Sequence, residues 1–314
     1  MTGKIAIVGA GLIGRSWAIV FARGGYEVAL YDADAGQTAR ALETIGVSLA
    51  DMEDAGLIAG AGSLKTLIRK AANLDEAVEG AAHVQENVAE RLDVKRQVFA
   101  EIDRLAAKDA VLASSSSALM PSFIFENLAG RERCMVAHPM NPPHLAPIVE
   151  LCGAPFTAPK TVVRARETFA RCGMAPIAVR REIDGFILNR LQHAVLNEAF
   201  RLIANGYVSA ADLDSTLKEG LALRWSFMGP IETIDLNAPG GVADYLARYG
   251  ETIRRVGSDI AASGDWPDDV AAVMDAERRK AVPHENLVAE QAWRDRRLMA
   301  LAVHKKDAAK RFGK

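Results

Sequence analysis

Two residues in the stretch VAHPMNPPHLAPIVEL, residues 136–151, could do acid–base chemistry together. His138 ends a strand-like run, and Glu150 follows twelve residues later inside the apolar run APIVEL. A carboxylate in a buried strand is costly unless a partner replaces its lost hydration. The prolines between the two residues reverse the chain, so Glu150 could accept the Nδ1–H of His138 and favour the imidazolium. The spacing leaves a second interpretation open, in which the glutamate points to water.

A histidine in such a pair suits the removal of a hydroxyl proton while hydride leaves the same carbon, because its ordinary pKa is about 6.5. His138 is the candidate among six histidines because it ends a strand at a loop, where ligands of open α/β sheets gather. His144 lies in the Pro-rich loop, where we expect it to be exposed. The remaining histidines lie in helical or exposed contexts without a partner that the sequence reveals: His83, His193, His284 and His304.

Three glycines near the N-terminus indicate a dinucleotide site. Gly9, Gly11 and Gly14 fit G-x-G-x-x-G at the junction of an expected strand and helix, which is the context that the motif requires. Gly9 permits the tight turn, Gly11 lets a pyrophosphate approach the backbone, and Gly14 lets the helix pack closely on the strand. The helix begins at Leu12 and Ile13, and its free N–H groups would face the phosphates. The alternative is a glycine-rich turn that binds no ligand.

An acidic residue argues against that alternative. Asp32 ends the second expected strand, eighteen residues after Gly14. A carboxylate at this place accepts hydrogen bonds from a ribose diol and repels a 2′-phosphate. No arginine directly follows Asp32. The sequence therefore predicts NAD rather than NADP as the cofactor.

The segments around these residues alternate between strand and helix. Runs rich in β-branched residues predict strands, and helical spacing of apolar residues predicts helices. We expect strands within residues 4–11, 26–32, 82–88 and 110–116, and helices within residues 12–24, 34–56 and 90–106. This alternation predicts an α/β fold with a doubly wound, mostly parallel sheet. Only helical segments follow later, so we expect an α/β domain at 1–183 and an all-α domain at 184–314.

Composition excludes several classes of partner. The net charge of −2 and the pI near 6.3 favour neither a nucleic acid nor an anionic membrane. Arg15 interrupts the apolar N-terminal run, which argues against a signal peptide, so we expect a cytoplasmic protein. The three cysteines form no CxxC pair, and we expect buried free thiols and no metal site.

Several motifs, in this order and at these spacings, resemble the L-3-hydroxyacyl-CoA dehydrogenase family over nearly the whole chain. They are the glycine turn at 9–14, QENVAERLDVK at 85–95, SSSSAL at 114–119, HPMNPPHLAPIVE at 138–150 and DGFILNRL at 184–191. Within that family, HPMNPP, NRLQ and EGLALRWSFMGPIETIDLN are most similar to the L-gulonate 3-dehydrogenase and lambda-crystallin branch. The resemblance implies a Rossmann-type NAD-binding domain followed by a helical domain that binds substrate and forms a homodimer.

The resemblance also implies roles for individual residues. His138 matches the family's catalytic base, and Glu150 matches its partner. Ser117 matches the active-site serine, and Asn189 matches an asparagine on the first helix of the second domain. Both could hydrogen-bond the substrate oxygen that changes from hydroxyl to carbonyl.

Further matches concern the cofactor. Glu90 matches an acid that lines the nicotinamide region. The resemblance also implies cofactor contacts for Lys95 and Ser117 and a substrate contact for Asn141. One departure lies in the same region: Ser115 stands where the family usually has asparagine, which leaves the cofactor contacts at that position open.

A second departure concerns the substrate. Acyl-CoA-specific members carry a proline-containing turn where this chain has Leu223, Arg224 and Trp225. An arginine there can hold a free carboxylate through two parallel hydrogen bonds. We therefore expect Arg224 to anchor a small acid, and the alternative is a structural ion pair at a domain or dimer interface.

Together these residues predict NAD-dependent oxidation of the 3-hydroxyl of a small L-3-hydroxy acid, such as L-gulonate, to the 3-keto acid. One alternative is the same reaction on a 3-hydroxyacyl-CoA such as 3-hydroxybutyryl-CoA. Another is a crystallin-like structural protein, or a protein that binds NAD without turnover. The complete set of Ser117, His138, Glu150 and Asn189 argues against the last alternative, since a structural role does not require all four.

Overall fold

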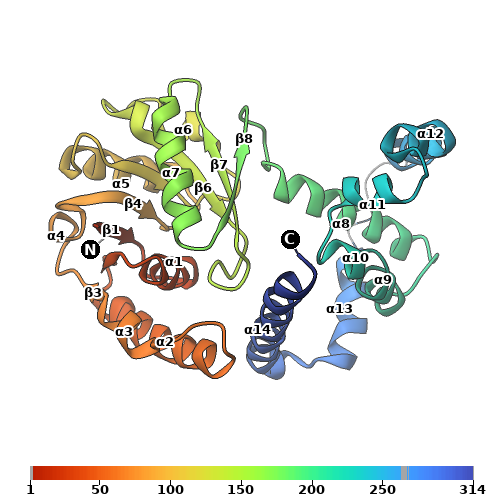
Figure 1. Ribbon diagram of the computed structural model, residues 1–314, viewed down its shortest axis with the longest axis horizontal. Coiled ribbons are helices and arrows are strands. Elements are labelled where there is room, and N and C mark those ends of the chain that lie inside the picture. The colour runs from red at the N-terminus through yellow and green to blue at the C-terminus, as the bar shows by residue number, and fades with distance from the viewer. Residues whose placement is uncertain (1–2, 263–266, 268, 314) are drawn as a thin grey trace. The chain divides into compact units, whose positions relative to one another are not determined.

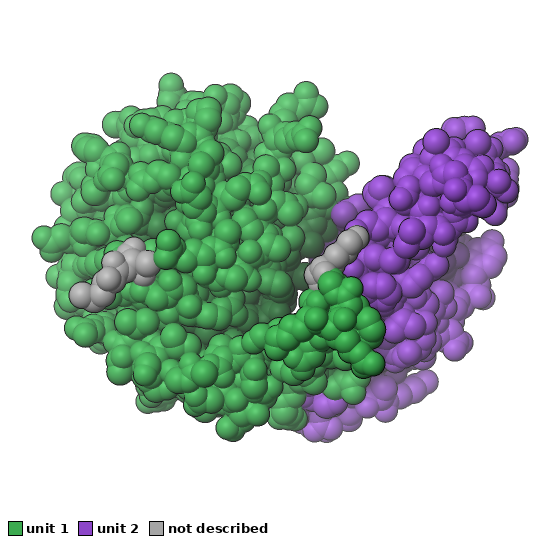
Figure 2. Space-filling model, viewed as in Figure 1, with its two compact units in different colours: residues 1–190, 294–314 green, residues 191–293 purple. Residues whose placement is uncertain are grey.

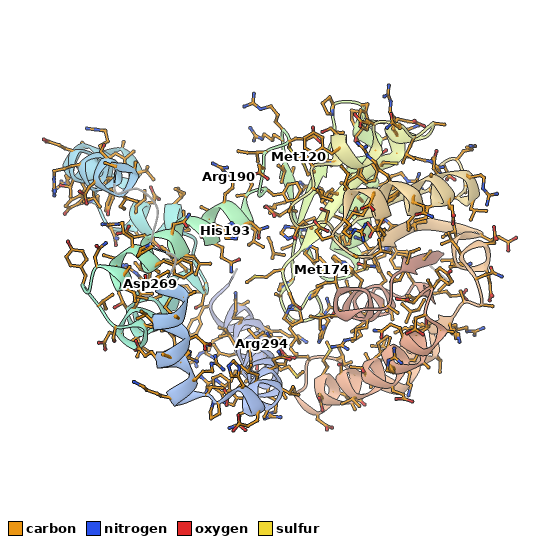
Figure 3. All side chains as sticks on the ribbon, turned by 180° about the vertical axis from the view of Figure 1, so that it is seen from behind. Met120, Met174, Arg190, His193, Asp269 and Arg294 are labelled. Atoms are coloured by element: carbon orange, nitrogen blue, oxygen red, sulfur yellow. The ribbon has the colours of Figure 1, made fainter. Side chains whose placement is uncertain are left out.

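The computed structural model describes residues 3–262, 267 and 269–313, and the chain divides into two compact units (Figure 2). The first unit comprises residues 1–190 and 294–314, and the second comprises residues 191–293. Arg190 and Arg294, labelled in Figure 3, are the residues at which the chain leaves and rejoins the first unit.

Part of the last helix belongs to the first unit, whereas the expected division assigned residues 184–314 to the second domain. Helix α14 (Leu287–Phe312) begins in the second unit and continues into the first. Within the first unit, Met299 is buried in the core, and Leu298 packs against the same core. Burial of these apolar side chains explains why residues 294–314 belong with the N-terminal part of the chain.

The first unit is built on one eight-stranded sheet with the order β3-β2-β1-β4-β5-β6-β7-β8 (Figure 1). In chain order the strands are β1 (Lys4–Val8), β2 (Glu27–Tyr31), β3 (Ile68–Lys70), β4 (Ala81–Glu86), β5 (Val111–Ser114), β6 (Cys134–Pro139), β7 (Ile148–Gly153) and β8 (Ala175–Val179). Neighbouring strands run parallel except β6 and β7. The order reverses between β1 and β4, which is the switch point where such sheets bind ligands. The predicted doubly wound, mostly parallel sheet is confirmed.

Helices cover both faces of this sheet (Figure 1). They are α1 (Leu12–Arg23), α2 (Ala35–Asp54), α3 (Ala61–Thr66), α4 (Leu74–Val78), α5 (Leu92–Leu105), α6 (Pro121–Phe125) and α7 (Pro159–Arg171). Strand β1 serves both layers, because Ile5 and Ile7 enter one apolar cluster while Ala6 and Val8 enter the other. Successive side chains of a strand point to opposite faces, so a sheet buried on both sides needs a continuous apolar run.

The second unit is helical, as expected. Its described elements include α8 (Leu188–Ala204), α9 (Ala210–Thr216), α10 (Ala222–Trp225), α11 (Pro230–Leu236), α12 (Gly241–Ala262), α13 (Val270–Ala281) and the start of α14. Glu277 of α13 accepts the N–H groups of Ala210 and Ala211, which satisfies two donors at the start of α9. Among the described residues of this unit, the buried side chains are small: Ala199, Ala210, Thr233, Ala238 and Val270. These residues contribute little buried apolar surface.

No described helix is long and apolar enough to cross a membrane. Across the same described residues, no group of three or more His, Cys, Asp or Glu side chains could hold a metal ion. Cys134, Cys152 and Cys172 are free and buried, and burial raises the pKa of each thiol. Thiolate chemistry is thereby disfavoured at all three positions.

Candidate active site

His138 and Glu150 face each other across the antiparallel strands β6 and β7. The register pairs the two residues directly, and His138 Nδ1 lies 2.7 Å from Glu150 Oε2. Both side chains are buried, with 5% of His138 and 0% of Glu150 exposed. Because the carboxylate engages Nδ1, Nε2 is the ring nitrogen left to act on a substrate. The structure thus brings together the two side chains that the sequence singled out.

The second carboxylate oxygen of Glu150 is held by the start of α8. Oε1 accepts the backbone N–H groups of Ile187 at 2.8 Å and Leu188 at 2.9 Å. Burial alone would raise the pKa of Glu150, but the hydrogen bonds from His138 and from these two N–H groups hold the pKa below its ordinary value. The carboxylate therefore stays ionised beside the imidazole.

A left-handed turn directs those N–H groups toward Glu150. Gly185 and Phe186 have φ angles of +72° and +48°. Positive φ is unusual for a residue with a side chain, so Phe186 must be held by its surroundings. Its ring is fully buried, and the ring centroid lies 5.6 Å from that of His138. The sequence analysis did not identify Phe186, because no residue pattern marks a non-glycine position with positive φ.

The side chain of Asn189 bonds to the backbone of Ser117. The Asn189 Nδ2 donates to the Ser117 carbonyl at 2.8 Å, while the Ser117 N–H donates to Glu90 Oε1 at 2.9 Å. Glu90 also accepts the Ser116 hydroxyl and the Ala118 N–H. Burial would raise the pKa of Glu90, but these bonds and a nearby ammonium hold the pKa below its ordinary value. One carboxylate thus fixes the loop that carries Ser117.

The nearby ammonium belongs to Lys95, which is almost completely enclosed. Its Nζ lies 2.9 Å from Glu86 Oε1, 3.3 Å from Glu90 Oε2 and 3.3 Å from the Val88 carbonyl. Only 1% of the Lys95 side chain is exposed. The resemblance implies a cofactor contact for Lys95, whereas its ammonium here contacts internal acceptors. We therefore take Lys95 as a residue that positions Glu90.

Glu86 is a functional candidate that the sequence analysis missed. It ends β4, is 0% exposed, and accepts the Ser114 hydroxyl at 2.6 Å in addition to the bonds from Lys95. Burial raises the pKa of Glu86, and the Lys95 charge and the hydrogen bonds only partly offset this effect. The available signal was a carboxylate within an expected strand, followed nine residues later by a lysine.

The glycine turn has the shape that a dinucleotide requires. Gly9 has a φ of +94°, and a Cβ atom there would lie 2.7 Å from the Asn87 carbonyl oxygen. A Cβ atom on Gly14 would lie 1.9 Å from the Gly9 carbonyl oxygen. At Gly11 a Cβ atom would meet nothing within 4 Å, so space remains over the start of α1. Gly11 caps α1 without a side-chain hydrogen bond, which leaves the first N–H groups for phosphate.

The acid after β2 also fits NAD. Asp32 accepts the Ala10 N–H at 2.8 Å and the Asp34 N–H at 2.9 Å, which holds its carboxylate beside the glycine turn. The nearest arginine on α2 is Arg40, and its guanidinium donates to Asp34 and Gln37. A 2′-phosphate would therefore be repelled by the Asp32 carboxylate, while Arg40 already donates to Asp34 and Gln37. The residues present fit NAD.

Two expected substrate contacts lie on exposed segments. Asn141 follows β6 and is exposed, and Arg224 lies exposed on α10 of the second unit. The Arg224 carbonyl accepts the N–H groups of Phe227 and Met228, which ends this short helix. Neither contact is tested by these positions, and both remain predictions.

Comparison with known proteins gives consistent matches. Residues 4–183 match the family described as 3-hydroxyacyl-CoA dehydrogenase, NAD binding domain, and residues 185–266 match its C-terminal domain. The Lambda-crystallin of Oryctolagus cuniculus is 44% identical over 312 residues, which cover 97% of each chain. The L-carnitine dehydrogenase of Streptomyces griseus is 37% identical over 251 residues, which cover 80% of this chain and 74% of that protein.

A solved structure extends the similarity to the fold. It is described as 5-formyl-3-hydroxy-2-methylpyridine 4-carboxylic acid 5-dehydrogenase, an NAD+ dependent dismutase. The two chains are 28% identical with a TM-score of 0.84, and the match covers 98% of this chain and 99% of that one.

Proposed function

We propose, from the premise that the chain belongs to the 3-hydroxyacyl-CoA dehydrogenase family of NAD-dependent oxidoreductases, that it oxidises the 3-hydroxyl of a small L-3-hydroxy acid to the 3-keto acid. L-gulonate is the substrate that we propose for the first assay. The observation that carries the proposal is the buried His138–Glu150 pair at 2.7 Å. Its orientation leaves one imidazole nitrogen to remove a hydroxyl proton.

In this mechanism His138 Nε2 takes the proton of the substrate 3-hydroxyl. Glu150 stabilises the imidazolium that forms, because its carboxylate accepts the Nδ1–H throughout. NAD, when bound, would accept the hydride that leaves the carbon bearing the 3-hydroxyl. Asn189 and Ser117 would hold the substrate oxygen in line, and the hydrogen bond between them fixes the distance from α8 to the Ser117 loop.

Two features support a free acid as substrate. Arg224 can bind a carboxylate with two parallel hydrogen bonds, which a thioester of coenzyme A does not need. A relative of the chain is an L-carnitine dehydrogenase, and L-carnitine is a small 3-hydroxy acid without coenzyme A. An acyl-CoA substrate is the competing possibility, since the family takes its name from that class.

We also propose a homodimer formed through the helical unit. Along α12, five large apolar side chains recur at intervals of three and four residues and are 40–49% exposed: Leu246, Tyr249, Ile253, Val256 and Ile260. That spacing places them on one face of the helix, where a second copy could bury them. Light scattering should give the mass of a dimer, and Ile253→Glu should shift it toward the monomer. Arg255→Glu, which changes charge on another face of α12, is the control.

The decisive assay compares substrates with purified protein and NAD. L-gulonate, L-carnitine and L-3-hydroxybutyryl-CoA are supplied separately, and the absorbance of reduced cofactor is followed. A higher kcat/KM for L-gulonate than for the thioester supports the proposal. A higher value for the thioester contradicts it, and NAD binding without turnover on any substrate would indicate a protein that binds the cofactor but does not catalyse.

A further inference from the structure

Ser115 lies at the centre of a hydrogen-bond network that joins three elements of the first unit. Its Oγ lies 2.9 Å from Trp17 Nε1 of α1, 2.7 Å from Gln85 Nε2 of β4 and 2.7 Å from Asn87 Oδ1 after β4. The Trp17 and Gln85 side chains are 0% exposed. Ser115 is also the position at which this chain departs from the asparagine that the family pattern suggests.

The chemistry of the groups sets the direction of each bond. An indole N–H can only donate, so Trp17 takes one lone pair of the Ser115 oxygen. The hydroxyl then has one lone pair and one proton left for the side-chain amides of Gln85 and Asn87. One amide must therefore present its NH2 group to the hydroxyl, and the other must present its oxygen. It accepts from the Gln85 NH2 group and donates to the Asn87 carbonyl oxygen.

The same direction continues into β4. Since the Gln85 nitrogen faces Ser115, its Oε1 faces His83 Nε2 at 3.0 Å and accepts from it. Burial lowers the pKa of His83 to about 4, so this ring is neutral and donates a single N–H. The order His83 to Gln85 to Ser115 to Asn87 is set at its far end, because only the Asn87 NH2 group can bond the carbonyl oxygens of Gln85 and Val8. A chain of buried hydrogen bonds with one allowed direction rigidifies the side chain at its end.

That last side chain borders the dinucleotide turn. The Asn87 Nδ2 donates to the carbonyls of Gln85 at 3.0 Å and Val8 at 3.4 Å, which leaves its Oδ1 to accept from Ser115. The Asn87 backbone N–H also donates to the Val8 carbonyl, at 2.7 Å. Val8 is the last residue of β1 and directly precedes Gly9, whose Cα approaches the Asn87 carbonyl so closely that no Cβ fits.

We propose that Ser115 is a positioning residue for NAD, which acts by fixing the Asn87 amide and thereby the Gly9 turn that the cofactor pyrophosphate approaches. The inference depends on NAD as the cofactor and not on the proposed substrate. It predicts that loss of the hydroxyl weakens cofactor binding while the proton chemistry at His138 is unaffected.

Three variants test this idea by two measurements that need no substrate. Ser115→Ala removes the hydroxyl, Ser115→Thr keeps it, and Asn87→Ala removes the amide while leaving Ser115 to accept from Trp17 and Gln85. The Trp17 indole N–H resonance reports on the bond to Ser115 in the free protein, and Trp17→Phe assigns the signal. Calorimetry measures the dissociation constant for NAD. Thr168→Val is the control, because its hydroxyl donates to the Arg164 carbonyl within α7 and lies outside the Ser115 network.

We expect Ser115→Ala to shift the Trp17 resonance and to raise the dissociation constant for NAD about 5- to 10-fold, the size of effect of one lost hydrogen bond. Ser115→Thr should restore both values. Asn87→Ala should weaken NAD binding to a similar extent with the Trp17 signal unmoved. In turnover, the KM for NAD should rise in both variants while kcat changes less than about twofold.

A double variant distinguishes positioning from a separate effect on the fold. If Ser115 acts through Asn87, the Asn87→Ala/Ser115→Ala protein binds NAD no more weakly than Asn87→Ala alone. Multiplicative losses would overturn the proposal. It is equally overturned if Ser115→Ala shifts the Trp17 signal but binds NAD normally, or if Ser115→Thr binds NAD as weakly as the alanine variant. Should Ser115→Ala not fold, normal NAD binding by Asn87→Ala would overturn it.

Discussion

Glu86 and Lys95 form an ion pair of 2.9 Å in which 0% and 1% of the two side chains are exposed. Glu86 ends β4, and Lys95 of α5 also lies 3.3 Å from Glu90, whose carboxylate accepts the Ser117 N–H. Removing one member of a buried pair leaves the other charge without compensation. This arrangement makes the pair a support of the site rather than a contact with ligands.

Lys95→Met should strongly destabilise the protein. The change leaves the Glu86 carboxylate buried without a cation, which costs about 3–5 kcal/mol of unfolding free energy. Urea unfolding followed by circular dichroism measures the loss. The double variant Glu86→Leu/Lys95→Met should lose less than the single variant, because no charge is then left unpaired. Arg91→Met is the control, since Arg91 and Asp93 are each 68% exposed and water screens their attraction. Equal losses in the single and double variants would contradict this explanation.

His138→Asn should abolish most of the activity. Loss of a general base lowers kcat by about 10²- to 10⁴-fold. His304→Asn, at an exposed position of α14, is the matched control and should keep the wild-type rate. Near-normal turnover by His138→Asn would remove the base assignment.

Glu150→Gln should change how stability depends on pH. The folded-state pKa of Glu150 lies below its ordinary value, so its stabilisation is complete above that ordinary value and is lost as pH falls through the lowered one. The amide cannot titrate, so the variant should be less stable at neutral pH and lose less on acidification. Urea midpoints measured between about pH 6 and pH 3 test this, with kcat at neutral pH as a second readout. Parallel curves for the two proteins would show that Glu150 does not contribute.

Arg224→Met should raise the KM for the free acid about 10- to 100-fold, the equivalent of one charge-assisted hydrogen-bonded contact. Arg224→Lys should recover only part of the loss, because lysine keeps the charge but lacks the planar pair of donors. The dissociation constant for NAD should stay unchanged. Arg278→Met, at an exposed position of α13, is the control. An unchanged KM in Arg224→Met would refute the carboxylate anchor.

The parts of the site that could be predicted from sequence are those with a local signature. The roles of Gly9, Gly11 and Gly14 follow from backbone demands within one strand–turn–helix unit. Glu150 was noticed because a carboxylate stands out within an apolar strand. The same argument did not identify Glu86, because Gln85 and Asn87 flank it and its strand therefore does not read as apolar. In the structure, both polar neighbours form internal hydrogen bonds with Ser115.

Other features depend on contacts that no local pattern encodes. His83 lies in β4, within the strand expected at 82–88, although it was also grouped with the histidines of helical or exposed contexts; it is buried and bonds to Gln85 two residues later on the same face of the strand. His144 was expected to be exposed, yet it is half-buried and its carbonyl accepts from Arg23. The sequence shows that Leu298 and Met299 are adjacent apolar residues of α14, but it does not show that they pack in the core of the first unit.

The carboxylate of Glu150 connects the imidazole to the first turn of α8, one oxygen to each. In the proposed mechanism each catalytic cycle would change the charge on that imidazole, and the change would also alter the electric field felt by the amides of Ile187 and Leu188. Those two amides thereby help to keep ionised a carboxylate whose other oxygen faces a histidine nearly fifty residues earlier in the chain. Substitutions at Gly185 and Phe186 should consequently raise the pKa of Glu150, even though neither residue carries a titratable group.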